Sequence, residues 1–298
     1  MRIPDREPAV QIVNRSRKNS VALETTLLIH GVPSNSSRSL AHELAGIVDA
    51  QGAHPVLVGV VDGKPTIGMT DDELDALIDA PSVPKANTGN LGVYLKRKSH
   101  AATTVSTTME LAHAAGVRVF ATGGLGGVHS GYGENWDVSA DLMAFTQFPV
   151  AVVTSGVKSI LDVVSTREAL ETLGIPVVGF RTDSFPAFYL PESAAGVDAR
   201  FDDADELADY VRFELARTSR GIVVANPIPQ EHALDPVQWD EWLTLAKDRA
   251  EQEHARGRAW TPAVLGAVHE FSGGATLRAN IGLVKSNTTL AGMLAARL

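Results

Sequence analysis

Short apolar runs, most of them rich in valine, alternate along the chain with longer amphipathic stretches. The runs have the length of β-strands, whereas the stretches between them repeat apolar residues at helical spacing. Valine-rich strands that alternate with helices are typical of a largely parallel sheet with both faces covered. The sequence therefore predicts an α/β protein with three layers, α/β/α, around a largely parallel or mixed central sheet.

The pattern places each expected element. Residues 55–69 contain two strands around the turn residues Asp62 and Gly63, and Thr70 is the predicted N-cap of the helix that follows. No repeat, low-complexity tract or linker interrupts the series, which indicates one domain over residues 1–298 with an N-terminal extension over residues 1–19. The other expected strands are 20–25, 117–123, 148–155, 175–180 and 221–227, and the expected helices include 36–52, 70–80, 103–116 and 203–216.

Composition and charge narrow the class of protein. The 298 residues carry a formal net charge of -9, whereas a general nucleic-acid binder needs clustered Lys and Arg. The chain has no cysteine, which excludes disulfides, thiolate metal sites and cysteine nucleophiles. No apolar run approaches the ~18 residues of a membrane span. We therefore expect a cytoplasmic protein that binds neither nucleic acid nor membrane.

In parallel sheets the chemistry gathers at the carboxyl ends of the strands. Four strand ends carry polar or glycine residues: Glu24, the loop after Val119, the loop after Val153, and Asn226. Glu24 lies inside an apolar run. It is either a general acid or base whose pKa is raised by burial, or a carboxylate at the solvent-exposed end of a strand.

The loop after Val119, "FATGGLGGVHSGYGENWDVSADL", has the richest chemistry. Its glycines allow close backbone approach, so that amide groups could converge on a phosphate, although it matches neither G-x-G-x-x-G nor a P-loop. His129, Asp137, Ser139 and Asp141 follow. Asp137 and Asp141 have the i, i+4 spacing that makes them neighbours on a helix, and their hard oxygens suit Mg²⁺ or Mn²⁺. The alternative interpretation is that the glycines only shape the loop and that one of the two aspartates caps a helix.

Lys158 follows the loop after Val153. Ser159 to Asp162 resembles a capping box, which predicts a helix start with Ser159 as N-cap. Together with burial, the dipole of that helix would lower the pKa of the Lys158 amine and favour a Schiff-base nucleophile. The alternative is a surface lysine. Ser155-x-x-Lys158 also has the spacing of a Ser-Lys acyl hydrolase, but the K-T-G element of that class is absent.

Taken together, these segments resemble the pseudouridine-5′-phosphate glycosidases, a family related to the indigoidine synthase A proteins. The resemblance covers roughly residues 20 to 290. The segments that carry it are, in order, "ALETT", "HGVP", "VPK" (83–85), "ATTVSTTM" (102–109), "FATGGLGGVH", "DVSADL", "SGVKSILD", "VVANPIP" and "NIGLVKSN".

The resemblance implies an enzyme that reversibly cleaves the C–C glycosidic bond of pseudouridine 5′-phosphate, with Mn²⁺, to uracil and ribose 5-phosphate. By position, Lys158 matches the lysine that forms an imine with the ring-opened ribose, Glu24 the proton donor, and Asp137 the metal ligand. The resemblance also implies a homotrimer. The expected substrate-binding residues are Lys85, Val105, His129, Ser139, Ala140, Asp141 and Asn287. Asn280 and Asn287 either reach the site or only hold a helix in place, and we favour the site for Asn287.

Three positions depart from the family pattern. Thr25 stands where serine is common, Ser106 where alanine is expected, and Ser130 where a basic residue is common. The last departure leaves open what that side chain does near the phosphate. The rival functions are a Schiff-base aldolase acting on another sugar phosphate, the Ser155–Lys158 acyl hydrolase, and a non-catalytic binder of a nucleotide or sugar phosphate.

Overall fold

The structure is a computed structural model that describes residues 10–129, 137–253 and 260–298. Within these residues the central sheet has eleven strands. They are β1 (Val13–Asn14), β2 (Ser20–Glu24), β3 (His54–Val61), β4 (Lys64–Ile67), β5 (Lys85–Ala86), β6 (Ala101–Thr103), β7 (Val119–Ala121), β9 (Ala151–Thr154), β11 (Val177–Phe180), β12 (Ala199–Phe201) and β13 (Ile222–Ala225). A separate pair joins β8 (Val128–His129) to β10 (Leu161–Asp162).

The order β3-β2-β7-β9-β13-β11-β12 forms the parallel part of the sheet. Beyond it, β3 pairs antiparallel with both β4 and β6. The sheet is therefore mixed and largely parallel, as the valine-rich pattern predicted. Its helices are α1 (Thr25–His30), α2 (Ser34–Ala50), α3 (Asp71–Ile78), α4 (Leu91–Arg97), α5 (Val105–Ala114), α6 (Ala140–Gln147), α7 (Val163–Thr172), α8 (Ala204–Arg217), α9 (Pro236–Gln252), α10 (Trp260–Phe271) and α11 (Ala275–Ala295).

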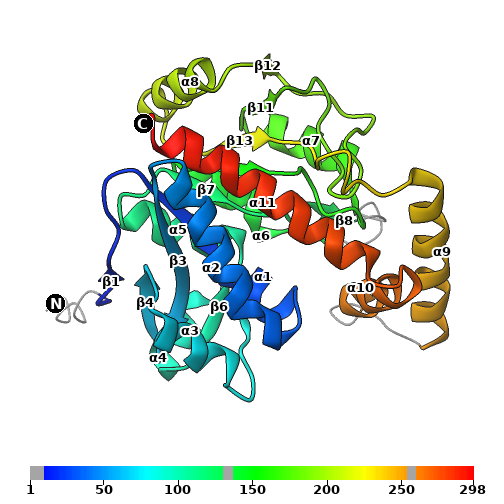
Figure 1. Cartoon of the computed structure of the whole chain (residues 1–298), viewed down its shortest axis with the longest axis horizontal. Helices are drawn as coiled ribbons and strands as arrows, with labels where there is room; N and C mark the ends of the chain where they lie inside the picture. Colours follow the sequence, from blue (N-terminus) through cyan, green and yellow to red (C-terminus); the bar gives the residue numbers. More distant parts are fainter. Residues whose placement is uncertain (1–9, 130–136, 254–259) are drawn as a thin grey trace, which may run out of the picture.

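Both faces of the sheet are buried. In β9, Ala151 and Val153 pack into one hydrophobic cluster, whereas Val152 packs into the other. The alternation follows from the two-residue period of a strand, and it explains why these runs are apolar at every position. Helices α2, α8 and α11 contribute to the first cluster and α5, α6 and α7 to the second, and Figure 1 shows α2 and α11 lying across one face. The three predicted layers are confirmed.

Local signals agree with the structure in most places. Asp62 and Gly63 both have positive φ, 49° and 71°, and they turn the chain between β3 and β4. The Thr70 hydroxyl accepts a hydrogen bond from the Glu73 amide, and the Glu73 carboxylate accepts one from the Thr70 amide, so that α3 begins at a complete capping box.

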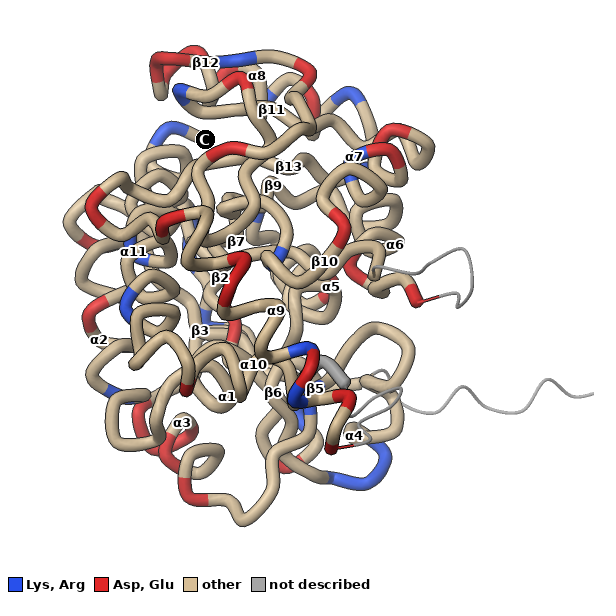
Figure 2. Tube along the Cα trace, turned by 90° about the vertical axis from the view of Figure 1, so that its right-hand side faces the viewer, with Lys and Arg blue, Asp and Glu red and all other residues tan. Residues whose placement is uncertain are grey.

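The start of the chain takes part in the sheet. β1 pairs parallel with β4, which places residues 13–14 at one sheet edge, while residues 1–9 of the expected extension lie outside the described residues. In the view of Figure 2, lysines and arginines lie scattered among acidic residues along the chain. None of the described helices combines the length and the apolar composition that crossing a membrane requires.

Candidate active site

The carboxyl ends of the neighbouring strands β2, β7 and β9 open onto one cavity of about 220 Å³. Glu24 comes from the end of β2, Gly123 and Gly124 from the loop after β7, and Lys158 from the segment after β9. Lys85, on the short strand β5, lines the same cavity. The structure therefore brings together the two predicted catalytic residues and one of the predicted substrate-binding residues.

Glu24 is partly buried at the point where β2 passes into α1. Burial raises the pKa of its carboxyl group above the ordinary value, and the nearby charge of Asp141 adds to this effect. The charges of Lys158 and Lys85 and a short hydrogen bond donated by the Thr122 hydroxyl to Oε1 oppose it without reversing it. A carboxyl group with a raised pKa can donate a proton close to neutral pH.

Lys158 belongs to a segment, residues 155–159, that pairs with the glycine loop, residues 122–127. The Ser155 amide donates to Gly123 O (2.9 Å), the Leu125 amide to Gly156 O (2.9 Å), and the Lys158 amide to Leu125 O (3.2 Å). Gly156 has φ +79°, and a Cβ atom there would lie 1.8 Å from Pro186 O. Only glycine fits this position, which lets the segment lie between the glycine loop and residues 186–190.

Two expectations about Lys158 are wrong. Helix α7 begins at Val163 with Asp162 as its N-cap, not at Ser159, and the residue Lys158 is exposed rather than buried. The Ser159 hydroxyl donates to Ala187 O (2.6 Å) and accepts from the Tyr189 amide (3.2 Å), so it joins two loops instead of capping a helix. The helix dipole therefore does not act on the amine as the capping-box pattern suggested.

Lys85 is electrically coupled to the two catalytic candidates. Burial lowers the pKa of its ammonium group, the positive charge of Lys158 lowers it further, and the carboxylate of Glu24 raises it. The cavity thus holds one carboxyl group and two amines close enough to influence one another. An anionic ligand such as a phosphate would relieve the repulsion between the two amines.

Asp141 does not lie beside Asp137 on a helix, as the i, i+4 spacing of the two residues suggested. Because α6 begins at Ala140 with Ser139 as its N-cap, Asp137 and Asp141 do not share a helix. Asp141 is buried, and its two oxygens accept from the Ser106 amide (2.9 Å) and the Gly126 amide (2.8 Å). The carboxylate therefore ties the start of α5, where Val105 is the first residue and is buried, to the glycine loop.

Asp137 is the remaining candidate for a metal ligand. Its side chain is 65% exposed, and Oδ2 lies 3.9 Å from Nδ1 of His129. Over residues 10–129, 137–253 and 260–298, no three His, Asp or Glu residues converge on a common point. Mg²⁺ and Mn²⁺ usually keep several waters and need few carboxylates, so an exposed Asp137 fits a mostly hydrated ion. Ser130 lies outside the described residues.

Asn287 lies behind the cavity, not in it. Its side chain is fully buried: Nδ2 donates to Thr122 O (2.8 Å) and Ser155 Oγ (3.1 Å), and Oδ1 accepts from Nδ2 of Asn226 (2.9 Å). It therefore joins the ends of β7, β9 and β13. Asn280, one end of the same motif, lines the cavity instead. Ser155 is also fully buried, which removes it as a candidate nucleophile.

Comparison with known proteins identifies the family. A family model described as "Indigoidine synthase A like protein" matches residues 9–297. The chain belongs to this family. Among curated members, the pseudouridine-5′-phosphate glycosidase of Symbiobacterium thermophilum is 41% identical over 283 residues, covering 93% of this chain and 92% of the relative. The glycosidase of the same name from Caldanaerobacter subterraneus subsp. tengcongensis is 41% identical over 298 residues, 100% and 97% of the two chains.

Two solved structures share the fold of this indigoidine synthase A-like chain. The prealnumycin C-glycosynthase AlnA, in complex with ribulose 5-phosphate, is 32% identical with a TM-score of 0.87 and covers 94% of this chain and 91% of its own. An indigoidine synthase A-like protein from Thermotoga maritima is 33% identical with a TM-score of 0.88 and covers 99% of each chain.

Sequence reasoning missed several residues of the cavity in this family member. His30, Phe188, Tyr189 and Trp239 all line it. His30 belongs to the motif "HGVP", so the sequence did single out this residue, but no function was assigned to it. No sequence pattern pointed to Phe188. Its backbone has φ +63°, a value that a bulky residue rarely adopts and that the sequence does not predict.

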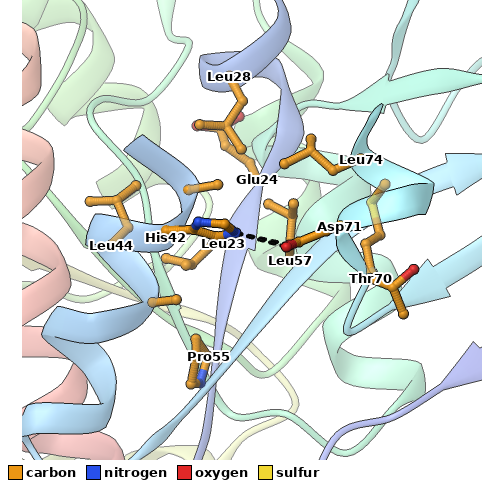
Figure 3. Close-up of a pocket in the computed structure, with 13 residues that line it drawn as sticks. Leu23, Glu24, Leu28, His42, Leu44, Pro55, Leu57, Thr70, Asp71 and Leu74 are labelled. Carbon is orange, nitrogen blue, oxygen red and sulfur yellow. Dashed lines mark hydrogen bonds and ion pairs between the residues drawn. The ribbon is translucent and has the colours of Figure 1, made fainter. Parts of the chain in front are cut away.

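A second cavity, of about 180 Å³, lies between α2, α3 and the strands β2 and β3 (Figure 3). Its lining is mainly apolar and includes Leu44, Leu57 and Leu74. Nε2 of His42 lies 2.9 and 3.0 Å from the two carboxylate oxygens of Asp71. Glu24 also lines this cavity, but Lys158 and Lys85 do not, so it lacks the amines of the cavity around Lys158.

The two asparagines of α11 predict a contrast in stability. Replacing Asn287 by Ala removes the side-chain donor to Thr122 O and Ser155 Oγ and leaves Asn226 Nδ2 with Ser286 Oγ alone, and it should lower the free energy of unfolding by about 2–4 kcal/mol. Asn280→Ala should cost under about 1 kcal/mol, because Asn280 Oδ1 has no hydrogen-bond partner in the described part of the chain. Urea unfolding of both variants measures the difference, and equal losses would contradict the role assigned to Asn287.

Proposed function

We propose that this chain is a pseudouridine-5′-phosphate glycosidase that cleaves the C–C glycosidic bond reversibly to uracil and ribose 5-phosphate through a Schiff base on Lys158. The observation that carries the proposal is the shared cavity of Lys158 and Glu24, a carboxyl group with a raised pKa. It is supported by relatives of that name that are 41–44% identical over at least 92% of this chain.

The bond to be broken explains why an amine is needed. C5 of uracil leaves as a carbanion equivalent, which is a far poorer leaving group than the oxygen or nitrogen of an ordinary glycoside. A pair of carboxylates, as used by common glycosidases, is therefore a poor template. If the Lys158 amine takes the place of the ring oxygen on C1′ as the ribose opens, its nitrogen lone pair can expel uracil. The electron pair of the C1′–C5 bond then goes to uracil C5, which takes up a proton, and C1′ becomes an iminium ion on Lys158.

Glu24 and Lys158 then have complementary roles. The protonated carboxyl group of Glu24 donates a proton to the ring oxygen as the ribose opens, and the amine of Lys158 attacks C1′. When the C1′–C5 bond breaks, uracil C5 takes up a proton and leaves. Water then hydrolyses the remaining imine, which releases ribose 5-phosphate and restores the amine.

The other residues bind and orient in this proposal. Lys85 supplies a positive charge for the phosphate. Val105, through its backbone, and the segment Ser139–Asp141 are proposed to bind substrate by resemblance; they do not line the cavity around Lys158. His129 lies beside Asp137, which would hold a divalent cation, Mn²⁺ by resemblance; such an ion neutralises negative charge on the substrate. Remote contacts of this kind contribute binding energy that orients the reacting atoms. A homotrimer is proposed on the resemblance alone and is tested by light scattering.

The rival that shares Lys158 is a Schiff-base enzyme acting on another sugar phosphate. The complex of AlnA with ribulose 5-phosphate shows that a structural neighbour binds a pentose phosphate and bears the name of a C-glycosynthase. In that rival function, the Lys158 amine forms the Schiff base with a sugar phosphate that is joined to a group other than uracil. The uracil-dependent reaction separates the two functions.

The decisive assay runs the reaction in the direction of synthesis. Uracil, ribose 5-phosphate and Mn²⁺ incubated with the protein should give pseudouridine 5′-phosphate, detected by liquid chromatography and mass spectrometry. Lys158→Ala should lose more than about 10³-fold of the rate, and Glu24→Gln about 10²–10⁴-fold. No product with the wild type, or full activity of Lys158→Ala, would contradict the proposal.

The hydrogen bond from Thr122 predicts a shift of the pH profile. It stabilises the ionised form of Glu24, so its loss in Thr122→Val raises the pKa of that carboxyl group further. Because the proton donor must be protonated, the fall in kcat/KM at high pH should then move upward, by about 1–2 pH units for a bond to a charged group.

Thr122→Ser is the matched control, because it restores the hydroxyl and should return the profile to that of the wild type. Measuring kcat/KM across the pH range for the three proteins tests the assignment. If the Val variant shifted the limb downward, or left it in place with an altered rate, Glu24 would not be the group that titrates.

A further inference from the structure

Three aromatic side chains form one wall of the cavity that holds Lys158. Phe188 and Tyr189 meet edge to face with ring centroids 4.6 Å apart, and Tyr189 lies 5.2 Å from Trp239. All three residues are less than a tenth exposed. Tyr189 thus contacts both of the other rings. The wall is thus a rigid apolar surface next to the reactive amine.

The backbone of Phe188 is strained. Its φ of +63° costs roughly 1–3 kcal/mol for a residue of this kind. The surrounding loops hold it there: the Phe188 amide donates to Ser155 O (2.9 Å), and the Ser159 hydroxyl bridges Ala187 O and the Tyr189 amide. The segment that carries Lys158 therefore also fixes Phe188, and strain that a fold maintains at a cavity points to function.

The glycine loop gives the ring room. A Cβ atom on Gly124 would lie 2.5 Å from Cδ2 of Phe188, so the ring rests directly on the backbone of the loop. At the preceding position, a Cβ atom on Gly123 would lie 3.2 Å from Oδ1 of Asn280. That oxygen is buried and has no hydrogen-bond partner within the residues that the structure describes. An apolar ring and an unpaired amide oxygen thus stand over consecutive loop positions.

These two features match a pyrimidine better than a sugar phosphate. Uracil is flat and uncharged, and its edge carries N–H donors beside carbonyl acceptors. A flat aromatic face binds it by stacking, and an amide oxygen without a protein partner can accept a hydrogen bond from an N–H group of its edge. Ribose 5-phosphate has no flat face and carries its charge at the phosphate, for which Lys85 is the nearby cation.

We propose that Phe188 is the specificity-determining residue for the base: the pyrimidine packs against its ring, and the Asn280 amide hydrogen-bonds the edge of the base. This inference rests on the proposed function. The two halves of the substrate then meet different parts of the cavity, the base at Phe188 and Asn280, and the sugar phosphate at the lysines.

The test compares KM values for the two substrates of synthesis. Phe188→Leu keeps an apolar side chain but removes the flat face, and it should raise the KM for uracil roughly 5- to 50-fold, as loss of base stacking does. The KM for ribose 5-phosphate should change less than about twofold, because that half of the substrate does not touch the ring. Phe188→Tyr, which retains the face, should restore the KM for uracil.

Equal changes in both KM values, or an unchanged KM for uracil in folded Phe188→Leu, would overturn the inference. If Phe188→Leu does not fold, Asn280→Ala decides: a rise confined to the KM for uracil supports the base site, and no rise refutes it. Wild-type synthesis of pseudouridine 5′-phosphate reads out the proposed function separately, so failure of one proposal is distinguished from failure of the other.

Discussion

The pairing between the glycine loop and the segment after β9 is the interaction on which the site depends. Three backbone hydrogen bonds join residues 122–127 to residues 155–159, and Gly156 allows the close approach to Pro186 that accompanies them. Because β2, β7 and β9 are adjacent and parallel, this pairing brings Lys158 to the cavity that Glu24 enters from β2. The buried Asn287 amide fixes the same strand ends from behind.

The electrostatics of the cavity follow from that arrangement. A carboxyl group between two amines would ordinarily be ionised, yet burial and the charge of Asp141 keep the pKa of Glu24 raised. Asp141 itself is held by two amides, one from the glycine loop and one from the start of α5. A residue expected to contact substrate thus adds to the effect of burial on the pKa of the predicted proton donor.

The sequence predicted the fold and the centre of the site because both depend on local patterns. Alternating apolar runs identified the sheet, and the strand ends placed Glu24, the glycine loop and Lys158 at one edge of it, where they line one cavity. Their catalytic roles were predicted from the family resemblance. What it missed depends on contacts between distant segments. Ser159 matched a capping box, but its hydroxyl hydrogen-bonds within residues 186–190 instead. Asn287 was expected in the site, but its side-chain amide is bonded to the ends of three strands. The positive φ of Phe188 is imposed by the loops around it.

The central claim is that Lys158 reacts with the sugar. Incubating the protein with ribose 5-phosphate, reducing with borohydride, and measuring the intact mass and the modified peptide tests it most directly. An imine formed with loss of water and then reduced by two hydrogens should appear as a single adduct of one pentose phosphate on the peptide that contains Lys158, and Lys158→Ala should show none. An unmodified wild-type protein, or an adduct carried by another residue, would contradict the account.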